Sequence, residues 1–193
     1  MFEQLFHTIN QKVQIAEEEL EIIKPFFIPK KIRKRQYLLQ EGDVCKYTAF
    51  VEKGALRSYS LDEKGNEHVV QFALEGWWIS DQYSVLTGEP SAYNIDALED
   101  SEILLISHIS FEGMLEKLPR MEKYFRILMQ NSMIAMQRRL VASLSLTAEE
   151  KYTRMINAYP NIIQRVPQHM IASYLGLTPE TLSRIRKQMS ASR

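Results

Sequence analysis

The sequence predicts an α+β protein with an antiparallel β-sheet body, one long helix and a C-terminal pair of short helices. Short β-rich runs separated by regularly spaced glycines occupy the region from Lys31 to about Ser107. An apolar pattern with helical spacing then runs from Pro119 to about Leu146, and two short amphipathic segments joined at Gly176 follow it. We expect three domains, at residues 1–116, 117–146 and 147–193.

Composition places few further limits on this 193-residue chain, because 45% hydrophobic and 25% charged residues are ordinary values for a soluble globular protein. No apolar run approaches the roughly twenty residues that span a bilayer, and the N-terminus lacks the pattern of a secretory signal. The single cysteine, Cys45, excludes an internal disulfide and a metal cluster held by several thiolates of this chain. We therefore expect a cytoplasmic protein without a cofactor.

The β-rich region contains six expected strands, at residues 37–39, 47–51, 55–61, 68–74, 93–98 and 101–106. Glycines recur between them at spacings of 12, 11, 11 and 12 residues. Such regular turns favour an antiparallel sandwich or jelly roll over alternating α/β units. Residues 62–66 read as a hairpin turn, with Gly65 available for a positive φ. We interpret the basic run at residues 30–35 as a charged edge strand, with a second electrostatic patch as the alternative.

The long segment after Pro119 is expected to be one helix with two apolar faces. The first face repeats at intervals of three or four residues and comprises Met121, Phe125, Met129, Met133, Met136, Leu140 and Leu144. The second repeats every seven residues and comprises Ile127, Ile134 and Val141. Because the closed β-sheet body can cover only one face, we expect the other to pack on the same helix of a second subunit. Burial within a monomer is the alternative.

The C-terminal segment has the start and stop signals of two helices. Pro167 is expected at the opening of the first, where a missing N–H is tolerated. Gly176 supplies the left-handed cap that ends it. Thr178 caps the second helix, and Pro179 takes its first position. Two short helices joined by a turn that contains glycine are the layout of a helix-turn-helix.

The outer surface of the second helix carries the residue types that contact bases and phosphates in a major groove. We therefore favour DNA binding over a simple αα-hairpin whose basic residues only complement the helix dipole. Residues 148–193 hold seven Lys or Arg and three Glu, a net charge of +4, which leaves −4 for the rest of the neutral chain. The expected DNA-binding residues are Gln168, His169, Thr178, Glu180, Thr181, Ser183, Arg184 and Lys187.

The segment Ile171-Ala-Ser-Tyr-Leu-Gly176 followed by Thr178-Pro-Glu-Thr-Leu-Ser-Arg184 resembles the helix-turn-helix of the cyclic-AMP receptor / fumarate–nitrate regulator (Crp/Fnr) family. This resemblance implies a transcription regulator whose Glu180 and Arg184 read base edges. The chemistry fits, since Arg pairs with guanine in two hydrogen bonds and Glu accepts from the cytosine amino group. Pro179 stands where relatives often have a polar reader, so that contact is not carried over.

The N-terminal half is similar to the β-roll of the same family. The similarity rests on Gln40-Glu-Gly-Asp43, on Phe50-Val-Glu-Lys-Gly54, on the strand–glycine spacing through Gly76, and on the short acidic helix at residues 16–23. The resemblance covers nearly the whole chain. It implies an antiparallel double-stranded, jelly-roll-like β-roll, a long dimerisation helix, a homodimer and a palindromic operator.

The phosphate-binding cassette of that family corresponds to Gly76–Asp96, and here the chain departs from the cyclic-AMP pattern. Ser91 and Ala92 stand at the positions of an Arg-Ser pair, and Asp81 lies near the position of the ribose-binding Glu. No Arg or Lys occurs between Gly76 and Ser110, so a bound phosphate would meet carboxylates such as Asp81, Glu89, Asp96 and Glu99. Cyclic AMP is therefore not the expected effector.

Aromatic side chains gather around the cassette and form either the core of the β-roll or a pocket for a small apolar or aromatic effector. Trp77 and Trp78 are expected at the entrance of the cassette. The residues expected in the effector pocket are Phe72, Trp78, Asp81, Tyr83, Ser91, Ala92 and Tyr93.

Enzyme signatures are absent from the sequence, which has no phosphate-binding glycine loop and no metalloprotease or hydrolase motif. The four histidines lack the spacing of metal ligands, so we expect neither a catalytic nor a metal site. Two interpretations remain: a dimeric regulator that binds DNA, or a β-roll signalling or interaction module whose helix-turn-helix has lost DNA binding. Residues 159–167 are too few for a wing hairpin, which keeps the second interpretation open.

Overall fold

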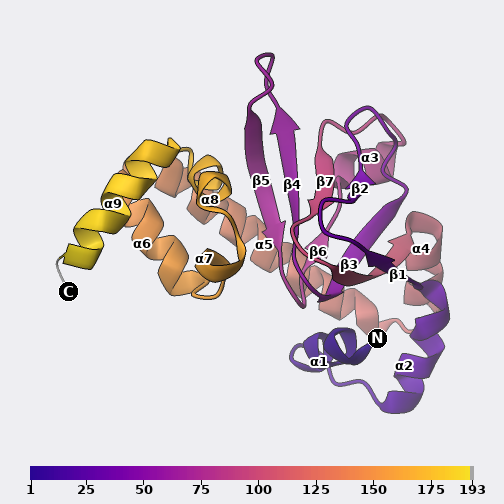
Figure 1. The fold of residues 1–193 in the computed structure, drawn as a ribbon. Coiled ribbons are helices and arrows are strands. Elements are labelled where there is room, and N and C mark those ends of the chain that lie inside the picture. The colour runs from indigo at the N-terminus through magenta and orange to yellow at the C-terminus, as the bar shows by residue number, and fades with distance from the viewer. Residues whose placement is uncertain (192–193) are drawn as a thin grey trace.

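The computed structural model describes residues 1–191 and places a β-roll beside a group of C-terminal helices (Figure 1). Two helices, α1 (Glu3–Asn10) and α2 (Glu17–Ile23), and a 3-10 turn, η1 (Lys24–Phe26), precede the first strand. The predicted acidic helix is α2. The helix α1 was not predicted from the sequence, although Leu5 and Ile9 are fully buried in it.

The β-roll consists of two four-stranded antiparallel sheets, with strand orders β1-β8-β3-β6 and β2-β7-β4-β5. The strands are β1 (Ile28–Ile32), β2 (Tyr37–Leu39), β3 (Tyr47–Lys53), β4 (Leu56–Leu61), β5 (Glu67–Ala73), β6 (Trp78–Ile79), β7 (Asn94–Ala97) and β8 (Ser101–Ser107). Small and aliphatic side chains from both sheets fill the space between them. The antiparallel two-sheet body and all six expected strands are confirmed.

Two further strands complete the sheets beyond those six. The strand β1 lies at the edge of its sheet and pairs only with β8, which confirms the charged edge strand. The strand β6 has two residues, too few to show an alternating pattern in the sequence. The expected hairpin turn between β4 and β5 is present: Gly65 has a φ of 79°, and the Asp62 carboxylate accepts hydrogen bonds from the N–H groups of Lys64 and Asn66.

The helix α3 (Gln82–Thr87) lies between β6 and β7, and α4 (His108–Lys117) follows β8. The predicted long helix is α5 (Arg120–Ser145), whose cap is Pro119. Its first turns are buried at Met121 and Tyr124 against α1, α2 and α4. The apolar side chains later in the helix are exposed, so the alternative that they are buried within the monomer is wrong. They are Met129, Met133, Ile134, Met136, Leu140, Val141 and Leu144.

Four helices complete the described chain: α6 (Ala148–Ala158), α7 (Ile162–Arg165), α8 (Gln168–Leu175) and α9 (Pro179–Ala191). Helix α7 occupies the segment judged too short for a wing hairpin. The apolar core of these helices is continuous with the outer face of the second sheet, where Tyr59, Val69 and Phe72 join it. The helix-turn-helix therefore rests directly on the β-roll, with α8 beside β5 (Figure 1).

Candidate nucleic-acid interface

The two helices of the helix-turn-helix begin and end at the residues that the sequence predicts. Helix α8 follows Pro167, which takes the cap position, and it ends at Gly176 with a φ of 68°. The Thr178 side chain caps α9 by accepting a hydrogen bond from the N–H of Thr181 at 3.2 Å. Pro179 is the first residue of α9. These local signals fix the angle at which α9 leaves the turn.

The inner faces of the two helices form one apolar core. Leu182 and Ile185 of α9 are 1% and 5% exposed, and they share a cluster with Ile171 and Ala172 of α8. Burial of these side chains fixes the rotation of α9 about its axis. Its polar residues consequently face outward.

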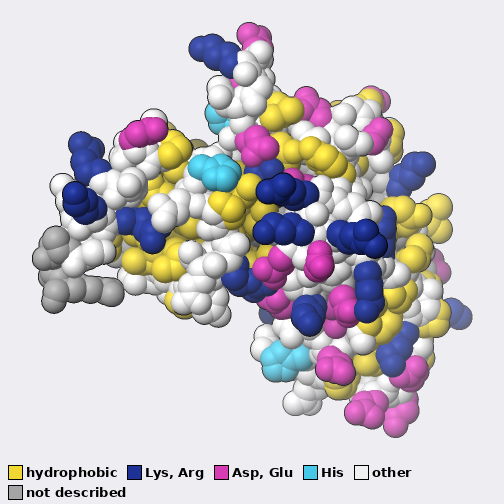
Figure 2. Space-filling model, in the orientation of Figure 1, with side chains coloured by type: hydrophobic (Ala, Val, Ile, Leu, Met, Phe, Trp, Pro, Cys, Tyr) yellow, Lys and Arg dark blue, Asp and Glu magenta, His cyan; other side chains and the backbone are white. Residues whose placement is uncertain are grey.

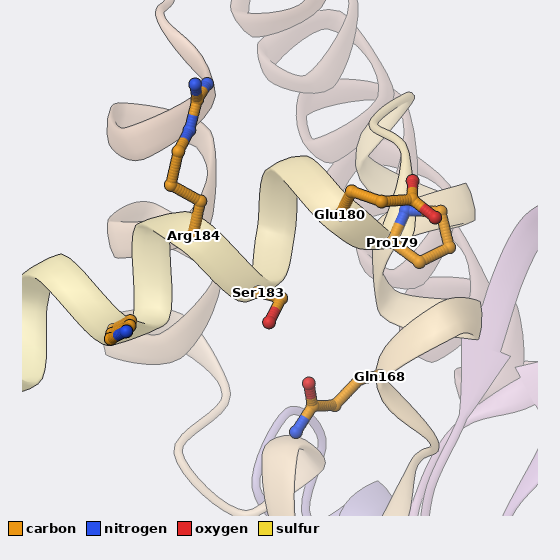
Figure 3. A pocket seen from close by; sticks show the side chains of 6 residues that line it. Gln168, Pro179, Glu180, Ser183 and Arg184 are labelled. Atoms are coloured by element: carbon orange, nitrogen blue, oxygen red, sulfur yellow. The ribbon is translucent and has the colours of Figure 1, made fainter.

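The outer face of α9 and the start of α8 border an open groove of about 600 Å³ (Figure 3). Its lining residues are Gln168, Pro179, Glu180, Ser183, Arg184 and Lys187. In Figure 3 the Ser183 and Gln168 side chains point toward each other, while Arg184 extends from the opposite side of α9. Of the eight predicted DNA-binding residues, five therefore line one groove. His169 and Thr178 are exposed outside this lining, and Thr181 is half-buried, with its hydroxyl 3.1 Å from that of Thr178.

The charged residues of this face have no ionic partner in the described part of the chain. Glu180, Arg184 and Lys187 form no ion pair with any other residue among 1–191. A solvated charge without an internal partner needs no stabilising contact to be broken before it binds a ligand. Chemically, the groove offers a carboxylate acceptor and two cationic donors, which suit base edges and phosphates.

Polar contacts that the sequence did not reveal hold this helix pair on the β-roll. The Arg165 guanidinium donates to both carboxylate oxygens of Glu75, at 2.7 and 2.8 Å, and also to the Glu99 carboxylate. Those hydrogen bonds raise the pKa of Arg165. Partial burial opposes ionisation of Glu75, but the hydrogen bonds from Arg165 and from backbone N–H groups, together with the charge of Arg165, lower the pKa of that carboxyl. In the sequence, Arg165 is only one of the seven Lys and Arg residues between positions 148 and 193.

The hydroxyl of Ser173 in α8 joins the same contact. It accepts from the N–H of Val69 at 2.9 Å and donates to the carbonyl of Glu67 at 2.7 Å, both in β5. Arg139 of α5 donates to the carbonyls of Val69 and Tyr174, and it lies 4.2 Å from the centre of the Tyr174 ring. The α5 helix, β5 and α8 thus meet at one point.

The segment expected to form the effector pocket is closed by its own hydrogen bonds. The Ser91 hydroxyl donates to the Asp81 carboxylate at 2.8 Å, and both residues are buried. The same carboxylate caps α3 by accepting from the N–H of Ser84. Ala92 is exposed and Tyr93 is half-buried.

The aromatic residues expected beside them lie elsewhere. Phe72 packs on Tyr174 in the cluster shared with the C-terminal helices, at 5.2 Å between ring centroids. Trp78 belongs to the cluster around α1 and α5, against Phe50, and Tyr83 is 64% exposed. Trp77 stacks edge-on against Tyr159 of the C-terminal group, so the two tryptophans do not mark the cassette entrance. These rings are close along the chain, but Phe72 lies on a strand of the second sheet and Trp78 on a strand of the first, so they join different clusters.

Two carboxylates expected to repel a phosphate are neutralised internally, because Glu99 pairs with Arg165 and Asp96 pairs with Arg57. Asp96 of β7 accepts two hydrogen bonds from Arg57 of β4, at 2.8 and 3.0 Å. Arg57 is also paired with Glu67 and stacks on Tyr59 at 4.1 Å. Burial works against the charge of Arg57, yet its bonds to the two carboxylates raise its pKa. Asp96 and Glu99 therefore do not face a ligand site as unpaired charges, and the expectation for these two residues is wrong.

Known proteins resemble this chain along most of its length. Residues 29–118 match the cyclic nucleotide-binding domain family. The fumarate and nitrate reduction regulatory protein of Vibrio cholerae is 27% identical over 183 residues, which cover 89% of this chain and 72% of that protein. The regulatory protein HlyX of Actinobacillus pleuropneumoniae is 26% identical, with coverages of 89% and 75%. Both matches extend beyond the β-roll into the C-terminal helices.

The chain is similar to regulators of the Crp/Fnr family along most of its length. The solved structure of FixK2 from Bradyrhizobium japonicum has a TM-score of 0.73 at 20% identity, and covers 86% of this chain and 85% of its own. The c-di-GMP-responsive global regulator CLP of Xanthomonas campestris has a TM-score of 0.74 at 13% identity, with coverages of 92% and 93%. These structures confirm the predicted fold: a β-roll, a long helix and a C-terminal helix group. Because its sequence relatives are regulatory proteins, this protein is a transcriptional regulator.

Residues 1–191 of this regulator contain neither a metal-binding cluster nor a membrane-spanning helix. No group of three or more His, Cys, Asp and Glu side chains in this part of the chain is placed to hold a metal ion. In the same part, no helix is both long and apolar enough to cross a membrane.

Proposed function

We propose that this regulator binds double-stranded DNA as a homodimer and reads a palindromic operator with α9. The observation that carries the proposal is the outward polar face of α9 at Glu180, Ser183, Arg184 and Lys187, opposite a fully buried apolar face. A helix that only covered the β-roll would not require these exposed polar side chains. A protein of this kind would act in the cytoplasm, where the chromosome is.

Within the groove, we assign base reading to Glu180 and Arg184, which lie one helical turn apart. Arg184 would donate to guanine and Glu180 would accept from cytosine. Phosphate contacts, which require no particular base, are assigned to the other predicted DNA-binding residues. They are Gln168, His169, Thr178, Thr181, Ser183 and Lys187.

The exposed apolar half of α5 supports the dimer. Met136 and Leu144 are 73% and 80% exposed, and five more large apolar side chains of the same helix are exposed with them. A continuous apolar stripe of this length marks an association surface. A second copy is its simplest occupant, because two-fold pairing of α5 would place two α9 helices on half-sites roughly 34–36 Å apart, or a multiple of that spacing.

The dimer is tested by the double variant Met133→Glu with Met136→Glu, which places four carboxylates in the paired interface. We expect monomers at micromolar concentration in sedimentation velocity, and an operator affinity lower by roughly 100-fold or more, since both half-sites no longer bind together. Asn131→Glu with Ala135→Glu is the matched control, because it adds the same charge on the opposite side of α5. A monomeric wild type would contradict the proposal.

The effector of this regulator is not expected to be cyclic AMP. Ser91 and Asp81 already satisfy each other, and residues 76–110 include no Arg or Lys to neutralise a cyclic phosphate. Burying a phosphate there without a counter-charge is strongly unfavourable. A small molecule without a phosphate is compatible with this chemistry.

DNA binding is tested with the DNA that lies upstream of the gene for this protein, and with duplexes selected from a random pool. We expect a footprint with inverted symmetry and an affinity that falls steeply with salt. If no duplex is selected and the upstream region binds no better than random DNA, the protein is instead a β-roll interaction module whose helix-turn-helix has lost DNA binding.

A further inference from the structure

The exposed apolar stripe of α5 is rich in methionine. Three of the nine methionines of the chain lie on it, Met129, Met133 and Met136, and their exposed fractions are 58%, 58% and 73%. They follow one another at intervals of four and three residues, so they lie on one side of the helix. We call this set the methionine triplet. By contrast, the face of the β-roll that Figure 2 shows is rich in Lys, Arg, Asp and Glu side chains.

Packing alone does not account for methionine at these three positions. Leucine and isoleucine define a helix–helix interface more sharply, because the methionine side chain is flexible and adapts to many shapes. Leucine is compatible with this stripe, since Leu140 and Leu144 continue it toward the end of α5. The two residue types also have similar helix propensities. What methionine adds is a thioether sulfur that oxidants attack.

Sulfur atoms elsewhere in the described chain are less accessible. Among the other methionines the exposed fraction is highest at Met1, at 39%, and the rest are half-buried or buried: Met114, Met121, Met155, Met170 and Met189. Cys45 is buried, and this burial raises the pKa of its thiol, which disfavours the reactive thiolate. An oxidant in solution would therefore reach the methionine triplet first.

A two-electron oxidant such as hydrogen peroxide converts methionine to its sulfoxide. The sulfur lone pair attacks one peroxide oxygen, so that an S–O bond forms as the O–O bond breaks. The departing hydroxide takes the proton of the transferred hydroxyl and leaves as water. Sulfur is thus oxidised by two electrons, and the peroxide is reduced. Methionine sulfoxide reductases reverse the change.

A sulfoxide oxygen would find no hydrogen-bond donor in a paired interface. The neighbours of the methionine triplet on the stripe are Phe125, Leu140 and Leu144, whose side chains carry no donor. Two-fold pairing of α5 sets this stripe against an identical one, so the second copy supplies no donor either. Three unpaired sulfoxide oxygens from each copy would enter a contact without water, which is strongly unfavourable.

We propose that the methionine triplet is an oxidation site that controls dimerisation. A two-electron oxidant converts it to sulfoxides in the monomer, the oxidised chains no longer pair, and the operator is released until a reductase restores the thioethers. This inference rests on the proposed function, because the pairing of α5 is part of it. Pairing covers the methionine triplet, so bound operator should protect it from oxidation.

The test compares each protein before and after treatment with millimolar hydrogen peroxide. The variant is Met129→Leu, Met133→Leu and Met136→Leu, which keeps the side chains apolar and of similar volume. The matched control, Met170→Leu with Met189→Leu, removes two methionines of the C-terminal helices. Sedimentation velocity at micromolar concentration gives the oligomeric state, and mass spectrometry of peptides locates each added oxygen. Each variant is judged against its own unoxidised state, so a difference in starting affinity does not enter the comparison.

After oxidation, the wild type and the control should carry oxygen on the methionine triplet, and their dimer dissociation constants should rise by roughly 100-fold or more. Treatment with both methionine sulfoxide reductases, one for each sulfoxide epimer, should restore the dimer. The leucine variant should stay dimeric. A duplex selected from a random pool by the wild type should slow oxidation of the methionine triplet and leave that of Met1 unchanged.

Several results would overturn this inference and leave the proposed dimer intact. They are a wild type that stays dimeric with the methionine triplet oxidised, a methionine triplet that stays reduced while Met1 is oxidised, a leucine variant that dissociates as the wild type does, and a dissociation that the reductases do not reverse. If the unoxidised wild type is a monomer at micromolar concentration, the proposed dimer fails, and this inference with it.

Discussion

Two polar clusters of the molecule contrast with each other: the outer face of α9 and the segment around α3. On α9 the charged side chains are exposed and have no ionic partner among residues 1–191. Around α3, Asp81, Ser84 and Ser91 are buried, and their hydrogen-bonding groups are satisfied within the chain. The first cluster retains its capacity to bind, whereas the second uses that capacity to stabilise the fold.

The difference arises from the way each cluster is built. The caps and the apolar stripe of α9 fix its orientation, so its polar side chains take no part in holding the helix. In the β-roll, the Asp81 carboxylate both caps α3 and accepts from Ser91, which comes from the chain leading to β7. A buried carboxylate needs such donors. A residue used in this way is not available to hold a ligand unless the segment opens.

The largest expected effect is on stability, from Asp81→Ala. Loss of the cap and of the acceptor for the buried Ser91 hydroxyl should lower the free energy of unfolding by about 2–4 kcal/mol. Urea denaturation of the variant measures the loss, and Gln82→Ala, an exposed change in the same helix, is the control. A drop below about 0.5 kcal/mol, the range of ordinary surface changes, would mean that Asp81 is not a structural residue.

Arg184→Ala is expected to affect DNA binding and to leave stability nearly unchanged. The free energy of unfolding should change by less than about 0.5 kcal/mol, while operator binding should weaken by about 1–3 kcal/mol and lose base preference at one position. Lys187→Ala is the comparison, because it should weaken binding to all sequences alike and make the salt dependence shallower. Competition titrations with operator and random DNA separate the two, and identical behaviour would remove Arg184 as a base reader.

A smaller effect is expected at the contact between the C-terminal helices and the β-roll. Because the pKa of Glu75 is lowered in the folded protein, its pairing with Arg165 contributes stability above the ordinary pKa of a glutamate. That contribution is lost as the pH falls through the folded-state value, and it should amount to about 1 kcal/mol because the pair is partly solvated. Hydrogen exchange at the Val69 N–H, followed from neutral to acid pH, measures this loss of stability.

In Arg165→Ala this part of the pH dependence should disappear, while Arg154→Ala, which removes an exposed charge of α6, should leave it intact. A pH profile of the Val69 amide that is the same in all three proteins would show that the ion pair does not hold the helix group in place.

The smallest effect is expected from cyclic AMP, which should give no saturable heat of binding and no shift in the thermal midpoint of unfolding. The closed Asp81–Ser91 pair and the absence of Arg and Lys from residues 76–110 give its phosphate no favourable site. Isothermal titration checks this directly, and micromolar binding would mean that the segment around α3 opens to supply donors that the folded state conceals.

Sequence patterns were sufficient to predict the features of the fold that depend on residues close together in the chain. Gly176, Thr178 and Pro179 marked the ends of α8 and α9, and the regular glycines marked the turns between the strands. The charged run at residues 30–35 was identified as an edge strand, but it did not reveal the left-handed backbone of Arg35.

What the sequence could not show depends on pairs of residues that are distant in the chain. Arg57 looked like an ordinary polar residue in an alternating strand, and its pairing with Asp96 follows only from the registry of β4 with β7. The contact of Arg165 with Glu75 joins two domains that were expected to be separate. Likewise, Phe72 and Trp78 are near in sequence but fall in different clusters, because a strand and a turn direct them to opposite sides of the β-roll.

The Ser173 hydroxyl has a consequence for solubility. The strand β5 is the last of its sheet, so its N–H and carbonyl groups are open to another strand. By bonding both Val69 and Glu67, Ser173 occupies two of the positions through which a foreign strand would add. A β-roll produced without α6–α9 would leave that edge bare, next to the uncovered Phe72 and Val69, and would be prone to polymerise edge to edge. The helix group that we propose to read DNA thus also protects this edge of the β-roll from pairing with a foreign strand.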